Sequence, residues 1–371
     1  MNNWPDTRIL DLFGIELPII QAPMAGPTLH EMVVAVSEAG GLGSLPCALL
    51  SPVLQREQLA LIRAQTAKPI NLNFFCHRQP APDAERESAW RQRLRPYYLE
   101  LGLDPDGPVS ASNRQPFDAA SCALIEEFRP EVASFHFGLP TPELLARVRA
   151  SGAKIIASAT TVAEARWLEA RGVDAIIAQG FEAGGHRGHF LAEEIATQVG
   201  TFSLLPQVVD AVQVPVIATG GIADPRGIHA AFVLGAAAVQ IGTAYLFTPE
   251  AHLAAPHRSA LRSERAEQTA LTNLFTGRPA RGIVNRVMRE VGPISALAPA
   301  FPTAGGALAP LRAASEPRGN EDSGDFMSLW SGQSARLSRE GLGAGELTSW
   351  LAKEALSRMG RRVHRRESGN E

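Results

Sequence analysis

The stretch VPVIATGGIADPRGIHAAFVLGAAAVQIGT, residues 214–243, contains one complete copy of the unit on which this chain is built. Two short apolar segments, 214–219 and 238–243, flank a stretch that opens at Asp224-Pro225 and closes at Gly235. Aspartate before proline is typical of a helix start, and glycine is typical of a helix end. The apolar segments do not alternate with polar residues, which is typical of parallel strands buried on both faces. The stretch therefore predicts a strand–helix–strand unit of a parallel sheet.

The same unit recurs toward the N-terminus. Each further apolar segment is followed by a helical pattern; Thr28 and Thr161, each with a glutamate three residues later, predict capping boxes at two helix starts. Eight units in succession predict an α/β fold of the TIM (β/α)8 barrel type, with a doubly wound open sheet as the alternative. The six further predicted strands are 19–24, 42–47, 70–75, 132–137, 154–159 and 175–180.

Two connections are longer than a minimal unit requires. Residues 78–116 form a polar, proline-rich inserted loop after strand 3, and residues 182–189 form a glycine- and histidine-rich loop after the sixth strand. Both follow the carboxyl ends of strands, where barrel enzymes carry their active sites. We therefore expect the active site at this end of the barrel.

The chain beyond residue 244 is predicted to be a C-terminal helical extension of the barrel. It is expected to be helical over 264–275, polar over 316–325 and helical again over 345–359. The predicted barrel with its extension spans residues 10–345. Residues 360–371 contain four arginines and few apolar side chains, which is typical of a disordered basic tail rather than of a nucleic-acid-binding arm.

The composition indicates a protein that works on small molecules. The 371 residues are 45% hydrophobic and carry a formal net charge of −3, which favours neither a nucleic-acid nor a membrane partner. With no signal-peptide pattern at the N-terminus and no long apolar run, a cytoplasmic location is expected. The cysteines Cys47, Cys76 and Cys122 match neither a zinc pattern nor a disulfide framework, so we expect packing roles for them and no metal.

Glycines follow the last two predicted strands. Thr219-Gly220-Gly221-Ile222 follows the seventh strand, and Gln240-Ile241-Gly242-Thr243 follows the eighth. Loops at these positions commonly bind phosphate in barrels, because glycines let backbone N–H groups approach the anion. The two segments together predict a phosphate site, and the alternative is a pair of tight turns.

Two histidines stand at the predicted active-site end. His186 lies in the glycine-rich loop, where a neutral-pH acid or base is chemically useful, and the alternative is a surface histidine. His136 ends the fourth strand and either binds an anionic substrate or hydrogen-bonds within the barrel mouth. Asn71 is a polar residue in a buried strand, so it requires either a backbone partner or a polar ligand such as a flavin edge.

Seven segments of the chain, taken in their order along the sequence, resemble those of the nitronate monooxygenases, formerly called 2-nitropropane dioxygenases. The resemblance extends over residues 10–342, and the combination of His186 with the Gly-Arg-Pro-Ala-Arg-Gly segment is similar to the class I group. The segments that carry it are Gln21-Ala-Pro23-Met24-Ala25-Gly26, Asn71-Leu-Asn73-Phe, Ser134-Phe-His136-Phe-Gly138, residues 179–188, Ala218-Thr-Gly220-Gly221-Ile222, Gln240-Ile-Gly242-Thr243 and Thr276-Gly-Arg278-Pro-Ala-Arg281-Gly282.

This resemblance implies an FMN-dependent enzyme that oxidises alkyl nitronates, such as propionate 3-nitronate, with O2 to a carbonyl compound and nitrite. It implies single-electron transfer through a flavin semiquinone, chemistry that the cofactor supplies. It makes His186 the active-site histidine and His136 a second histidine at the substrate. The residues that it assigns to the flavin are Pro23 and Met24 against the ring, Asn71 and Gln179 at its polar edge, Gly184 beside it, and Gly220, Gly221, Gln240, Ile241, Gly242 and Thr243 at the phosphate.

The chain departs from the family pattern where the substrate pocket is closed. Tyrosines and a lysine are expected near the C-terminal segment, but residues 298–306 offer only Phe301. Tyr97 or Tyr98 of the insertion is the alternative cover. Two rival functions are an NAD(P)H-dependent FMN reductase, of the quinone or enoyl-acyl-carrier-protein type, and a flavin-binding protein without nitronate turnover. His136 and the 278–282 segment favour the monooxygenase, with the nitronate and O2 as small-molecule partners and a homodimer as the candidate assembly.

Overall fold

The parallel strands close into a barrel, as the repeated unit predicts. The computed structural model describes residues 4–109, 112, 114–192, 194–316 and 324–367, with side chains described up to residue 360. The barrel strands are β1 Ile19–Gln21, β2 Gly43–Pro46, β3 Ile70–Phe75, β4 Val132–His136, β5 Lys154–Ala159, β6 Ala175–Gln179, β8 Val216–Thr219 and β9 Ala238–Ile241. They form one eight-stranded sheet in the order β1-β9-β8-β6-β5-β4-β3-β2. β1 pairs in parallel with β9, and Ile20 bridges to Leu42 at the start of β2, which completes the ring.

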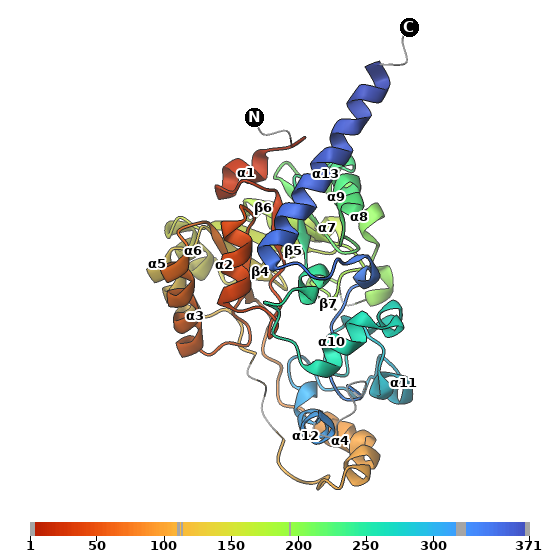
Figure 1. The fold of residues 1–371 in the computed structure, drawn as a ribbon. Coiled ribbons are helices and arrows are strands. Elements are labelled where there is room, and N and C mark those ends of the chain that lie inside the picture. The colour runs from red at the N-terminus through yellow and green to blue at the C-terminus, as the bar shows by residue number, and fades with distance from the viewer. Residues whose placement is uncertain (1–3, 110–111, 113, 193, 317–323, 368–371) are drawn as a thin grey trace.

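Helices cover the outside of the barrel (Figure 1). They are α2 His30–Glu38, α3 Pro52–Gln65, α5 Ala119–Phe128, α6 Pro142–Ala150, α7 Val162–Glu169, α8 Thr201–Ala211, α9 Pro225–Val233 and α13 Ala344–Glu367, with the short α1 Arg8–Phe13 before β1. The final helix α13 packs against α9 and α2 and so lies over the junction where β1 meets β9. Its Thr348 is hydrogen-bonded at 2.7 Å to the hydroxyl of Tyr245, which follows β9. None of the helices in the described part of the chain is long and apolar enough to span a bilayer.

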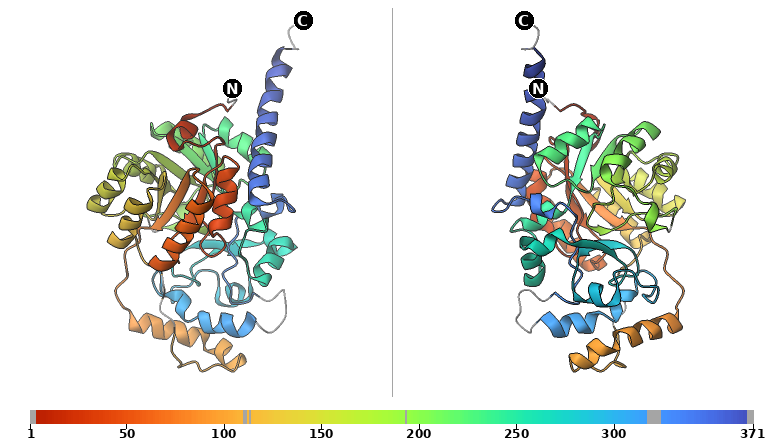
Figure 2. Two further views of the ribbon diagram at one scale, coloured as in Figure 1. Left: turned by 60° about the vertical axis from the view of Figure 1, so that its left-hand side comes forward. Right: turned by 90° about the vertical axis from the view of Figure 1, so that its right-hand side faces the viewer.

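A second layer lies beyond the carboxyl ends of the strands. Its three-stranded antiparallel sheet joins β7 Gly185–His186, β10 Thr269–Thr272 and β11 Ala280–Ile283. Figure 2 shows the orange helix of the insertion beside the blue helix of the C-terminal segment, below the barrel. Trp90 and Tyr98 hold the two together, because their side chains donate to the carbonyl oxygens of Ala304 and Ala307. The helices of this layer are α4 Ala84–Glu100, α10 Ala255–Arg262, α11 Arg286–Val291 and α12 Ala309–Ser315, and the 3-10 turns of the chain are η1 Ile195–Thr197, η2 Thr243–Phe247, η3 Glu264–Glu267, η4 Ala304–Gly306 and η6 Ala335–Leu337.

Three local predictions are wrong. The insertion 78–116 is not simply a loop, because α4 occupies its centre. The segment 264–275 is a 3-10 turn followed by β10 rather than a helix. Thr28 does not cap α2: its hydroxyl accepts from Gln21 at 3.2 Å, and Leu29 is the N-cap without a side-chain hydrogen bond. The capping box at Thr161 is confirmed in part, since its hydroxyl accepts from the Glu164 backbone at 3.2 Å.

The end of the chain differs in extent from the expected tail. The helix predicted over 345–359 is present as α13, and its backbone continues to Glu367. Arginine is a good helix former, so the basic composition of this segment does not oppose a helix. Residues 368–371, and 317–323 of the predicted polar segment, lie outside the described residues.

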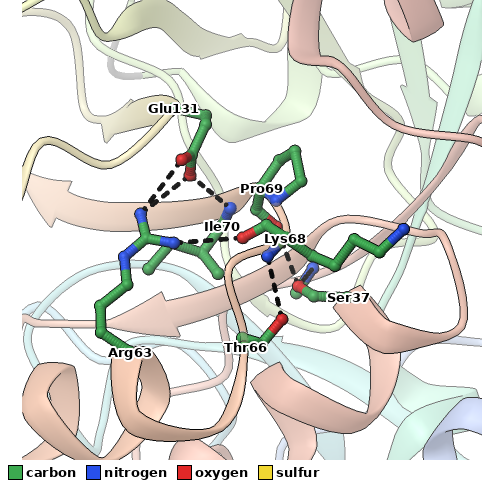
Figure 3. A network of polar contacts seen from close by, with 8 residues as sticks. Ser37, Arg63, Thr66, Lys68, Pro69, Ile70 and Glu131 are labelled. Carbon is green, nitrogen blue, oxygen red and sulfur yellow. Dashed lines mark hydrogen bonds and ion pairs between the residues drawn. The ribbon is translucent and has the colours of Figure 1, made fainter.

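A carboxylate fixes the start of β3 at the amino ends of the strands, on the side of the barrel opposite the second layer (Figure 3). Glu131 accepts from the Arg63 guanidinium at 3.0 and 3.2 Å and from the backbone N–H of Ile70 at 2.9 Å. Arg63 in turn donates to the carbonyl of Lys68 at 3.1 Å. This network ties α3, β3 and the residue before β4 together, far from the strand ends that form the pocket.

Candidate active site

A pocket opens at the carboxyl ends of the strands, between the barrel and the second layer. Its volume is about 440 Å³, within the range of ~300–1,000 Å³ that small-molecule sites occupy. Most of the residues predicted for the site line it together: Pro23, Met24, His136, Gln179, Gly184, His186, Gly220, Gly221, Gln240, Gly242 and Thr243. Two predicted residues do not line it, Asn71 and Ile241. The described residues contain no group of three side chains placed to hold a metal ion.

The loops after β8 and β9 form one wall of this pocket. Gly220 and Gly221 have φ angles of +103° and +73°, conformations that side-chain-bearing residues rarely adopt. The hydroxyl of Thr219 donates to the carbonyl of Gln240 at 2.8 Å, which holds the ends of the two strands together. Such turns expose backbone N–H groups, so this wall can hold a phosphate group.

A carboxylate that the sequence did not single out adjoins that wall. Glu182 accepts from the backbone N–H and hydroxyl of Thr201, at 2.8 and 2.9 Å, and so caps the start of α8. Glu182 also lines the pocket. Its charge is therefore engaged by the helix that follows the histidine loop.

Asn71 and Gln240 each hold a buried oxygen without a partner. Asn71 donates through Nδ2 to Ser44 at 3.0 Å, but its Oδ1 makes no hydrogen bond with a described residue, and neither does Oε1 of Gln240. Leaving such an oxygen unpaired costs ~1–3 kcal/mol, so a polar ligand at these atoms would remove a penalty. Ile241 has no such role, because its side chain is fully buried in the barrel core.

Gln179 and Gly184 both contact other parts of the protein. Gln179 Nε2 donates to the carbonyl of His186 at 3.0 Å, and its Oε1 accepts from the N–H of Gly188 at 2.7 Å. A Cβ at Gly184 would lie 2.5 Å from the backbone nitrogen of Gly332. Gln179 thus braces the histidine loop, and the missing side chain at position 184 lets the C-terminal segment approach it.

His186 lies at the centre of an aromatic cage. Its ring centroid is 5.9 Å from those of Phe75 and Phe137, 5.4 Å from Phe301 and 5.7 Å from Trp330. β7 carries it, and its partner strand is β11, where Ala280 is opposite His186. Its Nε2 lies 2.9 Å from the Thr276 hydroxyl, and Nδ1 makes no hydrogen bond with a described residue. No sequence pattern predicted this sheet.

His136 is held by the protein at both ring nitrogens. Nδ1 lies 3.0 Å from the hydroxyl of Ser158, and Nε2 lies 3.2 Å from the carbonyl oxygen of His186. The carbonyl can only accept, so Nε2 carries the proton and Nδ1 accepts from the serine. Of the two readings of the sequence, this geometry favours hydrogen bonding within the barrel mouth.

Both histidines are neutral at pH 7. Burial and then the charge of Arg278 lower the pKa of His136 to about 3. Burial and the charge of Arg114 lower the pKa of His186 well below its usual value. Neither imidazole is therefore charged before a ligand binds, and His186 can act as a neutral donor or acceptor.

The predicted cover of the pocket is replaced by other residues. Tyr97 and Tyr98 are buried in the second layer and do not line the pocket. Arg114 of the insertion, Arg312 of α12 and Trp330 line it instead. These three come from irregular or weakly patterned segments, so sequence periodicity gave no signal for them. The three cysteines are free, and burial raises the pKa of Cys47 and Cys76, which is consistent with packing roles.

Known proteins resemble this chain over nearly its whole length. A sequence model of the family described as Nitronate monooxygenase matches residues 6–354. Nitronate monooxygenase of Pseudomonas aeruginosa is 42% identical over 351 residues, which cover 94% of this chain and 98% of the relative. The crystal structure of nitroalkane oxidase from Streptomyces ansochromogenes superposes with a TM-score of 0.84 at 38% identity, covering 96% of this chain and 99% of that one. FabK from Thermotoga maritima superposes with a TM-score of 0.69 at 27% identity, covering 96% and 98%.

Proposed function

Because this chain belongs to the nitronate monooxygenase family, we propose that it binds FMN and oxidises alkyl nitronates with O2 to a carbonyl compound and nitrite. Propionate 3-nitronate is the representative substrate of this proposal. The observation that supports it most is the position of neutral His186 in the same pocket as the glycine loops after β8 and β9. Those loops offer the phosphate site that a flavin nucleotide requires.

The residues present fit FMN. Gly220, Gly221, Gly242 and Thr243 would hold its phosphate at the ends of β8 and β9. Pro23 and Met24, which line the pocket after β1, would lie against its ring. The unpartnered oxygen of Gln240, which lines the pocket, would accept from one of its polar groups. Bound FMN supplies the one-electron chemistry that the family resemblance implies, and the protein supplies binding and orientation.

Thr276 lets His186 serve in two protonation patterns. Its hydroxyl lies 3.3 Å from the carbonyl oxygen of Arg278 and 3.5 Å from the N–H of the same residue. It can therefore donate to that oxygen while it accepts from His186 Nε2–H, or accept from that N–H while it donates to Nε2. In the first pattern Nδ1 accepts a proton, and in the second Nδ1–H donates.

These two patterns suit two kinds of substrate. A preformed nitronate is an anion, so Nδ1–H of His186 would donate to one of its oxygens. A neutral nitroalkane must first lose its α-proton, and unprotonated Nδ1 of His186 would be the base that removes it. The surrounding Phe75, Phe137, Phe301 and Trp330 exclude water from the imidazole.

An anaerobic spectrum tests the proposal. The purified protein is loaded with FMN and mixed with propionate 3-nitronate or, separately, with NADH. We expect a change of the flavin spectrum with the nitronate and none with NADH, followed by nitrite release when O2 is admitted. Reduction by NADH with no response to the nitronate would make the protein the rival reductase instead. The cytoplasmic location and the homodimer stay predictions, and size-exclusion chromatography with light scattering tests the latter.

A further inference from the structure

Two arginines from distant segments line the same pocket. Arg114 lies in the insertion, between α4 and α5, and Arg312 lies in α12 near the C-terminus. They come together because α4 packs onto the C-terminal segment through Trp90 and Tyr98. The second layer therefore brings two positive charges to a pocket whose other wall is the barrel.

These charges have no carboxylate of their own in the pocket. Arg114 makes no side-chain hydrogen bond or ion pair with any residue that the structure describes. Arg312 has a loose contact of 3.9 Å with Glu316, one turn further on, and half of its side chain is exposed. Among the described residues that line the pocket, Glu182 is the only acidic one, and Thr201 engages it.

Arg278 and Arg281 lie nearby, but unlike Arg114 and Arg312 their guanidinium groups are bound by other groups of the protein. Arg278 donates to the carbonyl of His189 and lies 4.2 Å over the ring of Phe137. Arg281 donates to Phe181 at 3.0 Å and to Thr269 at 3.1 Å. Their positive charges are thus bound to carbonyl, hydroxyl or ring acceptors.

Arg114 lies within electrostatic range of both Arg312 and His186. Burial and the like charge of Arg312 lower the pKa of Arg114, and the charge of Arg114 contributes to the lowered pKa of His186. Two like charges held together in a partly buried site repel each other, so a bound anion would relieve this repulsion.

We propose that Arg114 and Arg312 form a carboxylate subsite that selects nitronates carrying a second anionic group at the far end of the molecule. The inference rests on the proposed function. The nitronate end would meet His186, and the carboxylate would meet the planar fork of Arg114, which is suited to two parallel hydrogen bonds. Phe75 and Trp330, which line the pocket and contact His186, would flank the carbon atoms between the two ends.

Steady-state kinetics with two nitronates of equal length test the subsite. Propionate 3-nitronate carries the carboxylate, and propyl-1-nitronate ends in a methyl group. In Arg114→Gln and Arg312→Gln we expect the KM for propionate 3-nitronate to rise about 10- to 100-fold, as when a charge-assisted hydrogen bond is lost. We expect kcat to be nearly unchanged, propyl-1-nitronate to be oxidised as before, and Arg114→Lys to recover part of the loss.

The matched control is Arg95→Gln. Arg95 lies in the same insertion but pairs with Asp106 at the surface, at 3.4 Å, outside the pocket. The substitution Arg95→Gln removes the same charge at a site outside the pocket, so the kinetics of this variant should equal those of the wild type. Equal losses for both nitronates in Arg114→Gln and Arg312→Gln, or no preference of the wild type for the carboxylate-bearing nitronate, would refute the subsite while leaving the proposed function intact.

Binding of succinate gives a readout that does not depend on turnover. Succinate has two planar anionic ends separated by two carbon atoms, like propionate 3-nitronate. Calorimetric titration of the FMN-loaded protein should show about tenfold or greater weakening in Arg114→Gln, with no change in Arg95→Gln. If neither nitronate is oxidised, the proposed function fails, and this titration still decides the subsite: unchanged succinate affinity in both arginine variants overturns it.

Discussion

The imidazole of His136 donates to the backbone carbonyl of His186 at 3.2 Å, and the amide of Gln179 donates to that same oxygen at 3.0 Å. Two barrel strands, β4 and β6, thus fix the position of the short strand that carries His186. The side chain of His186 is left to its partner Thr276 and to the pocket. One histidine consequently holds the backbone of the other, and we propose that His186 carries the chemistry while His136 positions it.

Replacing His186 separates its two roles. In His186→Asn we expect FMN to stay bound, because no phosphate-loop residue changes. Turnover of neutral nitroalkanes should fall about 10²- to 10⁴-fold, the usual contribution of a general base. Preformed nitronates should lose less, because they need no proton removal. Oxygen uptake with both substrate types measures this, and equal rates for wild type and variant would remove His186 from the chemistry.

The glycine after β8 should control FMN affinity. Gly221 has a φ angle of +73°, so Gly221→Ala strains the backbone by ~1–2 kcal/mol and displaces the loop. Fluorescence titration should show FMN binding weakened about tenfold. Gly152→Ala is the matched control, because Gly152 also has a positive φ, +94°, but follows α6 away from the pocket. The control should lose similar stability and keep its FMN affinity; parallel losses of affinity would argue against a phosphate site at Gly221.

Acid should destabilise the fold through its buried histidines. Burial is the first cause that lowers the pKa of His257 to about 4, against ~6.5 in the unfolded chain. The unfolded state therefore takes up the proton first as the pH falls below about 6.5, and stability is lost between there and pH 4. At pH 5.5 this single group costs up to ~1.4 kcal/mol.

Urea unfolding at pH 7.5 and 5.5 measures this effect. His257→Gln, which can still donate to the carbonyl of Trp330, should show a smaller loss of unfolding free energy between the two pH values than the wild type. The same pH dependence in variant and wild type would place the acid-sensitive group elsewhere, with His77, His136 and His189 as the next candidates because their pKa values are lowered to about 4, 3 and 4.

The network at the amino end of the barrel should matter for stability alone. Glu131→Ala leaves Arg63 and the N–H of Ile70 without their shared carboxylate, at a cost of ~1–3 kcal/mol. Glu127→Ala is the control, since Glu127 forms an exposed pair with Arg56 that is worth ~0–1 kcal/mol. Denaturant unfolding compares the two, and KM for nitronates should be unchanged in both. A change of KM in Glu131→Ala would show that this end of the barrel communicates with the pocket.

Sequence patterns predicted the barrel and the glycine turns after its last two strands because both depend on local signals. Short apolar strands, a helix cap at Asp224 and glycines after strands each report a conformation of the nearby backbone. The helix within the insertion was harder to predict. Trp90, Leu94, Tyr97 and Tyr98 follow a helical spacing and are the buried residues of α4, but the charged residues between them and Pro96 within the helix obscure that pattern.

Long-range contacts account for the other features that the sequence analysis did not predict or predicted wrongly. The sheet of β7, β10 and β11 pairs a two-residue strand with segments far along the chain, so no period in the sequence marks it. Thr28 has the pattern of a helix cap, but a tertiary hydrogen bond from Gln21 takes its hydroxyl. Arg114 enters the pocket through the packing of α4 on the C-terminal segment, which the sequence alone does not specify.

The position of α13 has a consequence for how the protein is made. The ribosome completes all eight barrel strands before it synthesises this helix, and α10, β10, β11, α11 and α12 of the second layer come between them. Until then the apolar surfaces of α2 and α9 that Leu347 and Leu351 finally cover stay exposed at the junction of β1 and β9. The nascent barrel therefore exposes an apolar stripe while about a hundred further residues are synthesised, and during this interval chaperones have a surface to bind.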